Sequence, residues 1–375
     1  MILYFFISLI YIFSYVMLIL KVTGFWQGTT DIRLAPAMSL TNRFISVIVI
    51  ARNEALHIES CLQSITLNAY PTDVYEIILV DDHSDDQTIE KARTLNIKNL
   101  TILSLANTPQ LSGKKAALQY AISHAKGDII ACTDADCRVQ PQWLSIINQS
   151  LRLTSQSMIT QLISYDDQET VLSRFQTLDL MATMAFYLFG INQKRFYSAN
   201  GTNMAFKKSA YQQGDLQTEI ASGDDVFLIQ AIAKRNPGAV RFIKSKVSIV
   251  STGVEQSFSA LLRQRWRWAT KSKAYADSGL FKLQSYILLF HLYIIINLVL
   301  GALIWPIMIF TGLFALFLKG IADYLLLNEI SQYYRQPKAL KWYVLSFLLY
   351  FPYIGYMATA AIFGKRVQWK GRELR

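Results

Sequence analysis

The stretch that decides the fold is Ile45-Ser46-Val47-Ile48-Val49-Ile50, followed at once by Ala51-Arg52-Asn53-Glu54. A short β-rich run closed by polar residues predicts a strand. A helix-spaced apolar pattern at 55–67 follows it, and a second β-rich run covers 76–80. The three segments predict a β-α-β unit with parallel strands.

The same alternation of short β-rich runs and amphipathic stretches continues from about residue 44 to 250. Residues 128–133 form a later predicted strand. This alternation is typical of an α/β domain, in which helices cover a mostly parallel sheet.

Polar residues follow each predicted strand, at the edge where open α/β sheets bind their ligands. A lone Asp pair is usually a turn or a helix cap. Three sets in order, each closing a strand, indicate instead a shared site for a nucleotide. The sets contain Arg52 and Glu54, then Asp81 and Asp82, then Asp134 and Asp136.

Asp134-Ala135-Asp136 predicts a metal site. Alternate residues of an extended chain point the same way, so two carboxylates can hold one Mg²⁺ or Mn²⁺, one of them through water. Such an ion neutralises a pyrophosphate and stabilises a leaving nucleoside diphosphate.

The apolar residues form three further regions outside this domain. Hydrophobic residues make up 52% of the 375 and charged residues 17%, compared with about 45–50% and about 25% in globular proteins. Residues 1–20, 283–318 and 342–363 contain most of the excess. Each region is long enough to cross a membrane.

The charges that flank the first apolar region predict its orientation. Lys21, Arg33 and Arg43 follow it and no charge precedes it, which favours an uncleaved anchor whose carboxyl-terminal side is cytosolic. We therefore expect a multi-pass protein of the cytoplasmic membrane with a cytosolic catalytic domain.

Gly301 and the Trp305-Pro306 pair mark an expected reversal in the second apolar region. Four full spans would place the basic tail outside, against the positive-inside tendency. The last region is therefore the best candidate for a re-entrant or interfacial helix, and three or four spans remain open. The expected divisions are an anchor at 1–22, the α/β domain at 44–250, an interfacial segment at 251–282, membrane or re-entrant helices at 283–363 and a tail at 364–375.

The net charge of +11 is compatible with nucleic acid, anionic lipid or phosphorylated substrates. Between Arg263 and Lys282 the basic residues alternate with Trp266, Trp268 and Tyr275. This pattern indicates a segment that faces lipid head groups, so we expect membrane lipids and no nucleic acid among the partners.

The three cysteines lack the spacing of a zinc site and are too few for a disulfide framework. We therefore expect Cys137, beside the acidic motif, to be a reduced, packed thiol.

The order of these motifs resembles family 2 of the inverting glycosyltransferases, which have the GT-A fold, over about residues 44–268. His83, where Gly is common, and Asp224, where Glu is usual, depart from the family pattern. Four more segments carry the likeness: Gly113-Lys114-Lys115-Ala116-Ala117, Asn200-Gly201-Thr202-Asn203, Ser222-Gly223-Asp224-Asp225, and Gln264-Arg265-Trp266-Arg267-Trp268, which matches the Gln-Gln/Arg-x-Arg-Trp pattern of membrane-bound members.

The resemblance implies a role for each matched residue. Asp225 would be the general base beside Asp224, and Asp134 and Asp136 would hold the metal. The acceptor side would consist of Asn200, Gly201, Thr202 and Trp266. Donor binding would involve Arg52, Glu54, Asp81, Asp82, Lys114, Asp134, Gln264, Arg265, Arg267 and Trp268.

Three functions are compatible with these features. The first is transfer of one sugar, with inversion, from a nucleoside-diphosphate sugar to a lipid or membrane-proximal acceptor. The second is a processive polysaccharide synthase with a polysaccharide acceptor, since such enzymes share the Gln-Arg-x-Arg-Trp pattern, although few spans are available for a channel. The third is a non-catalytic membrane protein that only binds nucleotide or assembles with others.

Overall fold

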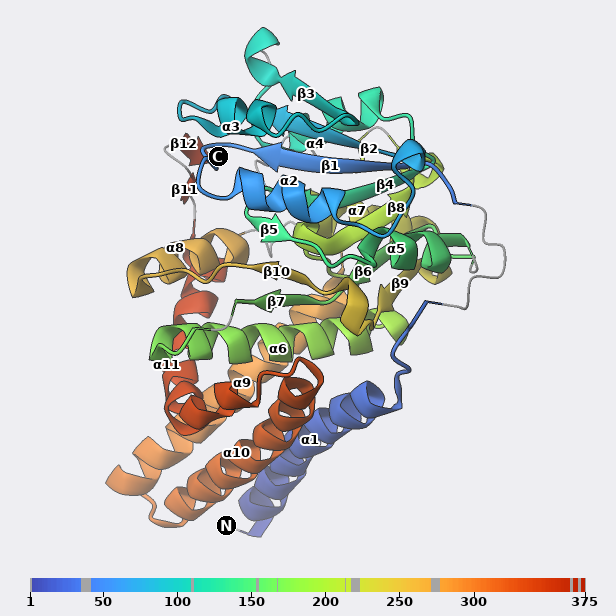
Figure 1. Ribbon diagram of the computed structural model, residues 1–375. Coiled ribbons are helices and arrows are strands. Elements are labelled where there is room, and N and C mark those ends of the chain that lie inside the picture. Colours follow the sequence, from blue (N-terminus) through green and yellow to red (C-terminus); the bar gives the residue numbers. More distant parts are fainter. Residues whose placement is uncertain are drawn as a thin grey trace.

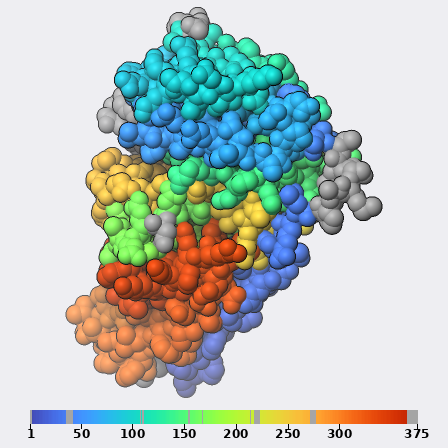
Figure 2. Space-filling model, viewed as in Figure 1, coloured from blue at the N-terminus to red at the C-terminus, as the bar shows by residue number. Residues whose placement is uncertain are grey.

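The computed structural model describes residues 2–34, 42–108, 111–152, 155–166, 168–212, 214–216, 223–270, 277–364, 367–369 and 372–374. Ser222, residues 271–276 of the interfacial segment and most of the basic tail lie outside them. A sheet domain stands on a base of long helices (Figure 1). The amino-terminal helix and the carboxyl-terminal helices share this base, dark blue and orange to red in Figure 2.

A seven-stranded sheet in the order β3-β2-β1-β4-β8-β6-β9 forms the centre of the domain. Its bounds are β1 Ile45–Ala51, β2 Tyr75–Asp81, β3 Leu100–Ser104, β4 Ile129–Asp134, β6 Met158–Gln161, β8 Met204–Lys207 and β9 Val240–Ile243. All neighbouring pairs are parallel except those of β8, which runs antiparallel to β4 and β6. The expectation of a mostly parallel α/β sheet is therefore confirmed.

The register of the first strands places the predicted acidic residues at one edge. Ala51 is paired with Asp81, and Ile50 with Asp134, so β1, β2 and β4 all end at the same level. Each of these strands is almost entirely buried, because helices cover both faces.

Helices cover the sheet and a small second sheet extends it. The covering helices are α2 Ile58–Thr66, α3 Thr88–Thr94, α4 Lys114–His124, α5 Trp143–Arg152 and α7 Asp224–Arg235. The second sheet has the order β5-β10-β7, with bounds Cys137–Arg138, Val250–Thr252 and Ile163–Tyr165. A carboxyl-terminal hairpin joins β11 Val367–Trp369 to β12 Arg372–Leu374.

The base consists of α1 Ile2–Gly28, α9 Ser278–Leu303 and α10 Ile307–Tyr333. The chain reverses between α9 and α10 at Trp305 and Pro306, and a Cβ on Gly301 would lie 2.3 Å from the Ile309 nitrogen. Asn297 accepts a hydrogen bond from Thr311 at 2.9 Å and another from Tyr4. Its side chain thereby joins α9, α10 and α1.

Two helices lie between the base and the sheet domain (Figure 1). The 22-residue helix α6 (Val171–Asn192) contacts α1 and α10 on one side and β7 and β9 on the other. The amphipathic helix α8 (Phe258–Ala269) contacts α11 (Tyr343–Phe363), which also packs on α6 and α9.

Four helices in the described part of the chain are long and apolar enough to cross a membrane by length and composition. They are α1, α9, α10 and the segment Pro337–Phe363, which joins the 3-10 helix η8 (Pro337–Trp342) to α11. Many large apolar side chains on these helices are exposed, such as Ile10, Phe310 and Phe317. Exposed apolar surface of this extent is typical of contact with a membrane.

Candidate active site

One large cavity of about 1360 Å³ lies at the carboxyl edge of the sheet. Most of the predicted site residues line it, although they come from widely separated segments. They are Arg52, Glu54, Lys114, Asp134, Asp136, Asn200, Gly201, Thr202, Asp224, Asp225, Gln264, Arg265, Arg267 and Trp268. Asp81, Asp82 and Trp266 are not among the described residues that line it.

Asp81 and Asp82 accept hydrogen bonds from backbone N–H groups and do not line the cavity. Asp82 is fully buried and accepts from the Gly113 nitrogen at 3.1 Å, while Asp81 accepts from the Ser84 nitrogen at 3.1 Å. Arg52 donates to the Asp82 carbonyl oxygen at 2.9 Å. Gly113 has φ +88, a conformation that glycine adopts without strain. The two acids thus fix the loops that begin the wall.

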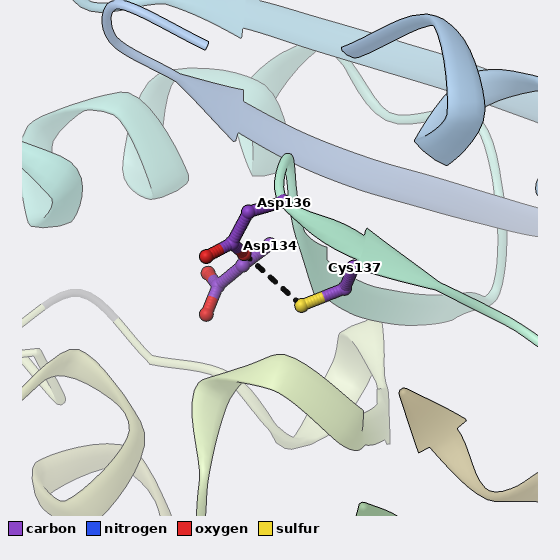
Figure 3. A group of neighbouring side chains, drawn as sticks. All are labelled: Asp134, Asp136 and Cys137. Atoms are coloured by element: carbon purple, nitrogen blue, oxygen red, sulfur yellow. Dashed lines mark hydrogen bonds between the residues drawn. The ribbon is translucent and has the colours of Figure 1, made fainter. Parts of the chain in front are cut away.

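Asp134, Asp136 and Cys137 form the described group suited to a metal ion, with one ligand atom from each within 4.8 Å of the others (Figure 3). The Cys137 thiol donates to Asp136 Oδ1 at 3.1 Å. Burial, with the Asp136 and Asp134 carboxylates, raises the pKa of Cys137 well above its usual value. A neutral thiol that donates to Asp136 leaves the two carboxylates as the ligands for a hard cation.

Lys114 forms ion pairs with Asp134 and with Asp224 in the first turn of α7. Its Nζ lies 2.5 Å from Asp134 Oδ1 and 3.9 Å from Asp224 Oδ2. Burial alone would lower the pKa of Lys114, but Asp134, Asp224 and Asp225 outweigh it and raise that pKa. Burial likewise opposes ionisation of Asp134, yet Lys114, Thr202 and Arg267 hold its pKa below the usual value.

Removing the ammonium should therefore change the pH dependence of the protein. In Lys114→Met, we expect Asp134 to protonate at a higher pH, because the opposite charge that helps to lower its carboxyl pKa is gone. The acid limb of the pH–rate profile should therefore move to higher pH. Rates of diphosphate release between about pH 4 and 8 measure this shift. The control Lys126→Met removes an exposed partner of Glu76 and should leave the limb in place. An unmoved limb in Lys114→Met would refute this electrostatic role.

Asp225 lines the cavity in the first turn of α7, next to Gly201 of the segment expected on the acceptor side. Its Oδ2 accepts from the Gly201 nitrogen at 2.9 Å and its Oδ1 from the Val226 nitrogen at 2.8 Å. The positive end of the helix dipole favours a carboxylate at this place. A side chain on Gly201 would approach Lys114 Nζ to 3.3 Å, so glycine lets Asp225 and the Lys114–Asp134 pair approach each other.

In the neighbouring segment, Asn200 to Asn203, the buried side-chain amide of Asn203 fixes the position of the backbone through hydrogen bonds. Asn203 is 0% exposed and accepts from Trp143 Nε1 at 2.8 Å and Gln161 Nε2 at 3.0 Å. Thr202 donates to Asp134 Oδ2 at 2.9 Å, and Asn200 caps the 3-10 helix η3 (Gly201–Asn203) by accepting from the Thr202 nitrogen. Within this segment, the Thr202 side chain therefore contacts Asp134.

The five residues of the Gln-Arg-Trp-Arg-Trp segment lie on α8 and face different neighbours. Residues two apart on a helix point roughly 200° apart, so Arg265 and Arg267 diverge. Arg267 faces the acids: burial lowers its pKa, while Asp134, Asp225 and Asp224 oppose that shift. The ring of Trp266 lies 5.2 Å from the ring of Tyr356 of α11, at an interplanar angle of 53°.

Arg265 faces α6 and the second sheet. It forms an ion pair of 3.0 Å with Asp179 and lies 4.2 Å from the ring of Trp268. Burial alone would lower the pKa of Arg265, but Tyr353, Tyr165 and Asp179 raise it overall. Asp179 was not predicted from the sequence. In the sequence, the only signal for Asp179 is that it is the one acidic residue in the long, mostly apolar segment that forms α6.

We expect this ion pair to matter for stability. Arg265→Met leaves Asp179 buried without its cation, which should reduce the free energy of unfolding by about 3–5 kcal/mol. Denaturant unfolding in detergent measures the loss, and Asp179→Asn in the same chain should recover part of it. Arg263→Met, an exposed position on the same helix, is the matched control. Unchanged stability with weakened donor binding would indicate instead that Arg265 binds the diphosphate.

Comparison with known proteins bears on this arrangement. Residues 46–214 match the family described as "Glycosyl transferase family 2". This chain contains a family 2 glycosyltransferase domain. The match covers β1, the acidic edge of the sheet and η3, so the expectation of a glycosyltransferase domain is confirmed for this part of the chain.

Relatives and a solved structure agree with the family 2 domain. Glycosyltransferase AglE of Haloferax volcanii is 38% identical over 109 residues, covering 28% of this chain and 35% of that protein. Probable glycosyltransferase YdaM of Bacillus subtilis is 26% identical over 234 residues, covering 60% and 54%. The chain thus spans about a third to a half of these relatives.

The fold is similar to that of a mannosyltransferase of Pyrobaculum calidifontis, solved in complex with GDP-Man and Mn²⁺. The TM-score is 0.55 and the identity 19%, over 96% of this chain and 99% of that one. The likeness extends beyond the family 2 domain to the long terminal helices.

Proposed function

We propose that the protein is a membrane glycosyltransferase that moves a sugar from a nucleoside-diphosphate sugar to a lipid or membrane-proximal acceptor. The single observation that carries the proposal is the shared cavity. In it, the acids of β4, the base candidate on α7 and Arg267 of α8 lie together, and the same cavity reaches α9 and α11.

The proposed reaction is a single displacement with inversion. Asp225 takes the proton of the acceptor hydroxyl as the acceptor oxygen forms a bond to the anomeric carbon. The bond from that carbon to the diphosphate oxygen breaks, and the nucleoside diphosphate leaves with the electron pair. Lys114 and Arg267 stand near the leaving group's expected place and attract its negative charge.

Asp136 and Asp134 are the residues that would hold a divalent cation, Mg²⁺ or Mn²⁺. Asp134 already accepts from Lys114 and Thr202, so Asp136 is the better direct ligand and Asp134 the better water-mediated one. When bound, the ion neutralises the diphosphate as it leaves. The Pyrobaculum mannosyltransferase, with GDP-Man and Mn²⁺ in its structure, supports this assignment.

The long helices support a location in the cytoplasmic membrane with the sheet domain on the cytosolic side. Four of them have the length and composition of spans. Lys21 lies in the carboxyl-terminal part of α1 and Arg33 follows the helix, which favours a cytosolic carboxyl-terminal side for α1. At that end Lys244 donates to the carbonyl oxygens of Trp26 and Thr29, so α1 is tied directly to the sheet domain.

The test is a screen of nucleotide-sugars for diphosphate release. The full chain, purified in detergent with Mn²⁺ or Mg²⁺ and supplied with membrane lipids, should release diphosphate from at least one donor. Product analysis then separates a single addition from a polymer. If the protein neither binds nor hydrolyses any nucleotide-sugar, the proposal fails.

A further inference from the structure

The cavity continues past the catalytic acids into an apolar groove between α9 and α11. Leu283, Ile287 and Leu288 line it from α9, and Ile354, Met357 and Ala358 from α11. Both helices belong to candidate membrane spans. A water-soluble sugar gains little from such a surface, whereas an aliphatic chain is stabilised when its methylene groups are buried there.

Most of the charged residues that line the whole cavity are carboxylates. Asp225, Asp179 and Glu255 are among them. Arg265 is already paired with Asp179 at 3.0 Å, and Lys114 with Asp134 at 2.5 Å. Arg267 faces Asp134, Asp225 and Asp224. Lys114 and Arg265 are thus paired with acids and Arg267 faces them, while Arg52 donates to the Asp82 carbonyl oxygen.

From these two observations we propose that the acceptor is a lipid with an uncharged, hydroxyl-bearing head group. Its hydroxyl lies at Asp225 and its apolar tail in the groove between α9 and α11. The inference rests on the proposed function and deepens it by naming the acceptor class.

A lipid phosphate fits this arrangement less well for two reasons. Its negative charge would lie among carboxylates of the same sign, and like charges that meet in a desolvated site repel each other. Its oxygen is also already ionised, so it would not need a base such as Asp225. An alcohol is neutral on entry and must lose its proton to a base during attack.

The first test fills the groove. Ala358→Trp should lower the ratio of lipid glycosylation to donor hydrolysis by at least about tenfold, since the added ring occupies the tail's place. Ala302→Trp, an exposed position on α9 outside the described lining, is the matched control and should leave the ratio unchanged. If Ala358→Trp does not fold, Ala361→Trp takes its place. An unchanged ratio in a folded groove variant overturns the proposal.

The second test compares head groups on matched tails. Phosphatidylcholine vesicles carrying the full chain receive dioleoylglycerol, dioleoyl phosphatidic acid, a polyprenol or the corresponding polyprenyl phosphate, with a radiolabelled donor chosen by its hydrolysis. We expect label in at least one alcohol, at least about tenfold above its phosphate. Label mainly in a phosphate, or in none of the four while hydrolysis continues, overturns this proposal alone. Absence of donor binding and hydrolysis would instead overturn the proposed function.

Discussion

Asp225→Asn is expected to lower turnover by about 100- to 10,000-fold, the range that a general base contributes. The amide keeps the size of the carboxylate, and its oxygen can still accept from the Gly201 nitrogen, which lies 2.9 Å from Asp225 Oδ2. The acceptor site should therefore keep its shape and lose only the group that takes the proton. Donor affinity should stay within about twofold, since the change removes a transition-state interaction.

Initial rates of diphosphate release and donor titrations measure the two effects separately. Asp73→Asn, an exposed acid in the first turn of the 3-10 helix η1 (Thr72–Val74), is the control and should behave as the unaltered protein. If Asp225→Asn turns over at the native rate, Asp225 is not the base, and the binding-only interpretation gains weight.

Removal of divalent cations should lower turnover by at least about 100-fold, because charge neutralisation at the leaving group contributes several kcal/mol. Excess Mn²⁺ or Mg²⁺ should restore it. Asp136→Asn should weaken Mn²⁺ binding more than the roughly 10- to 100-fold seen when a group behind the ligands is lost. Electron paramagnetic resonance titration of Mn²⁺, with a nucleoside diphosphate present, gives this affinity independently of turnover.

Cys137 offers the matched control for the metal site. Cys137→Ser keeps a donor toward Asp136, which now accepts from the thiol at 3.1 Å, so Mn²⁺ affinity should hardly change. A large loss of affinity in Cys137→Ser would show that the sulfur is a ligand. Full turnover of the native protein in the presence of a strong chelator would refute metal dependence altogether.

The sheet and its acidic edge follow from short-range patterns. The run from Ile45 to Ile50 predicted a buried strand, and the structure places β1 at Ile45–Ala51. The expected strand at 128–133 is β4, Ile129–Asp134. Parallel strands of similar length end at one edge, so residues just after them meet there whatever the loops do.

The directions of individual side chains did not follow from those patterns. Asp81 and Asp82 accept from the backbone at Ser84 and Gly113, and their expected contact with the nucleoside stays a prediction. Arg265 was expected beside the donor, and its guanidinium pairs with Asp179. Motif spacing does not specify the rotation of α8, which depends on how that helix packs against α6 and α11.

The amino-acid sequence by itself determined the strands, the acids that close them and the apolar helices, because each depends on residues near one another along the chain. Only the tertiary structure decided that α9 and α11 extend the cavity, and that Asp179 neutralises Arg265. Those contacts join residues far apart in sequence, and packing brings them together only when the helical base meets the sheet domain.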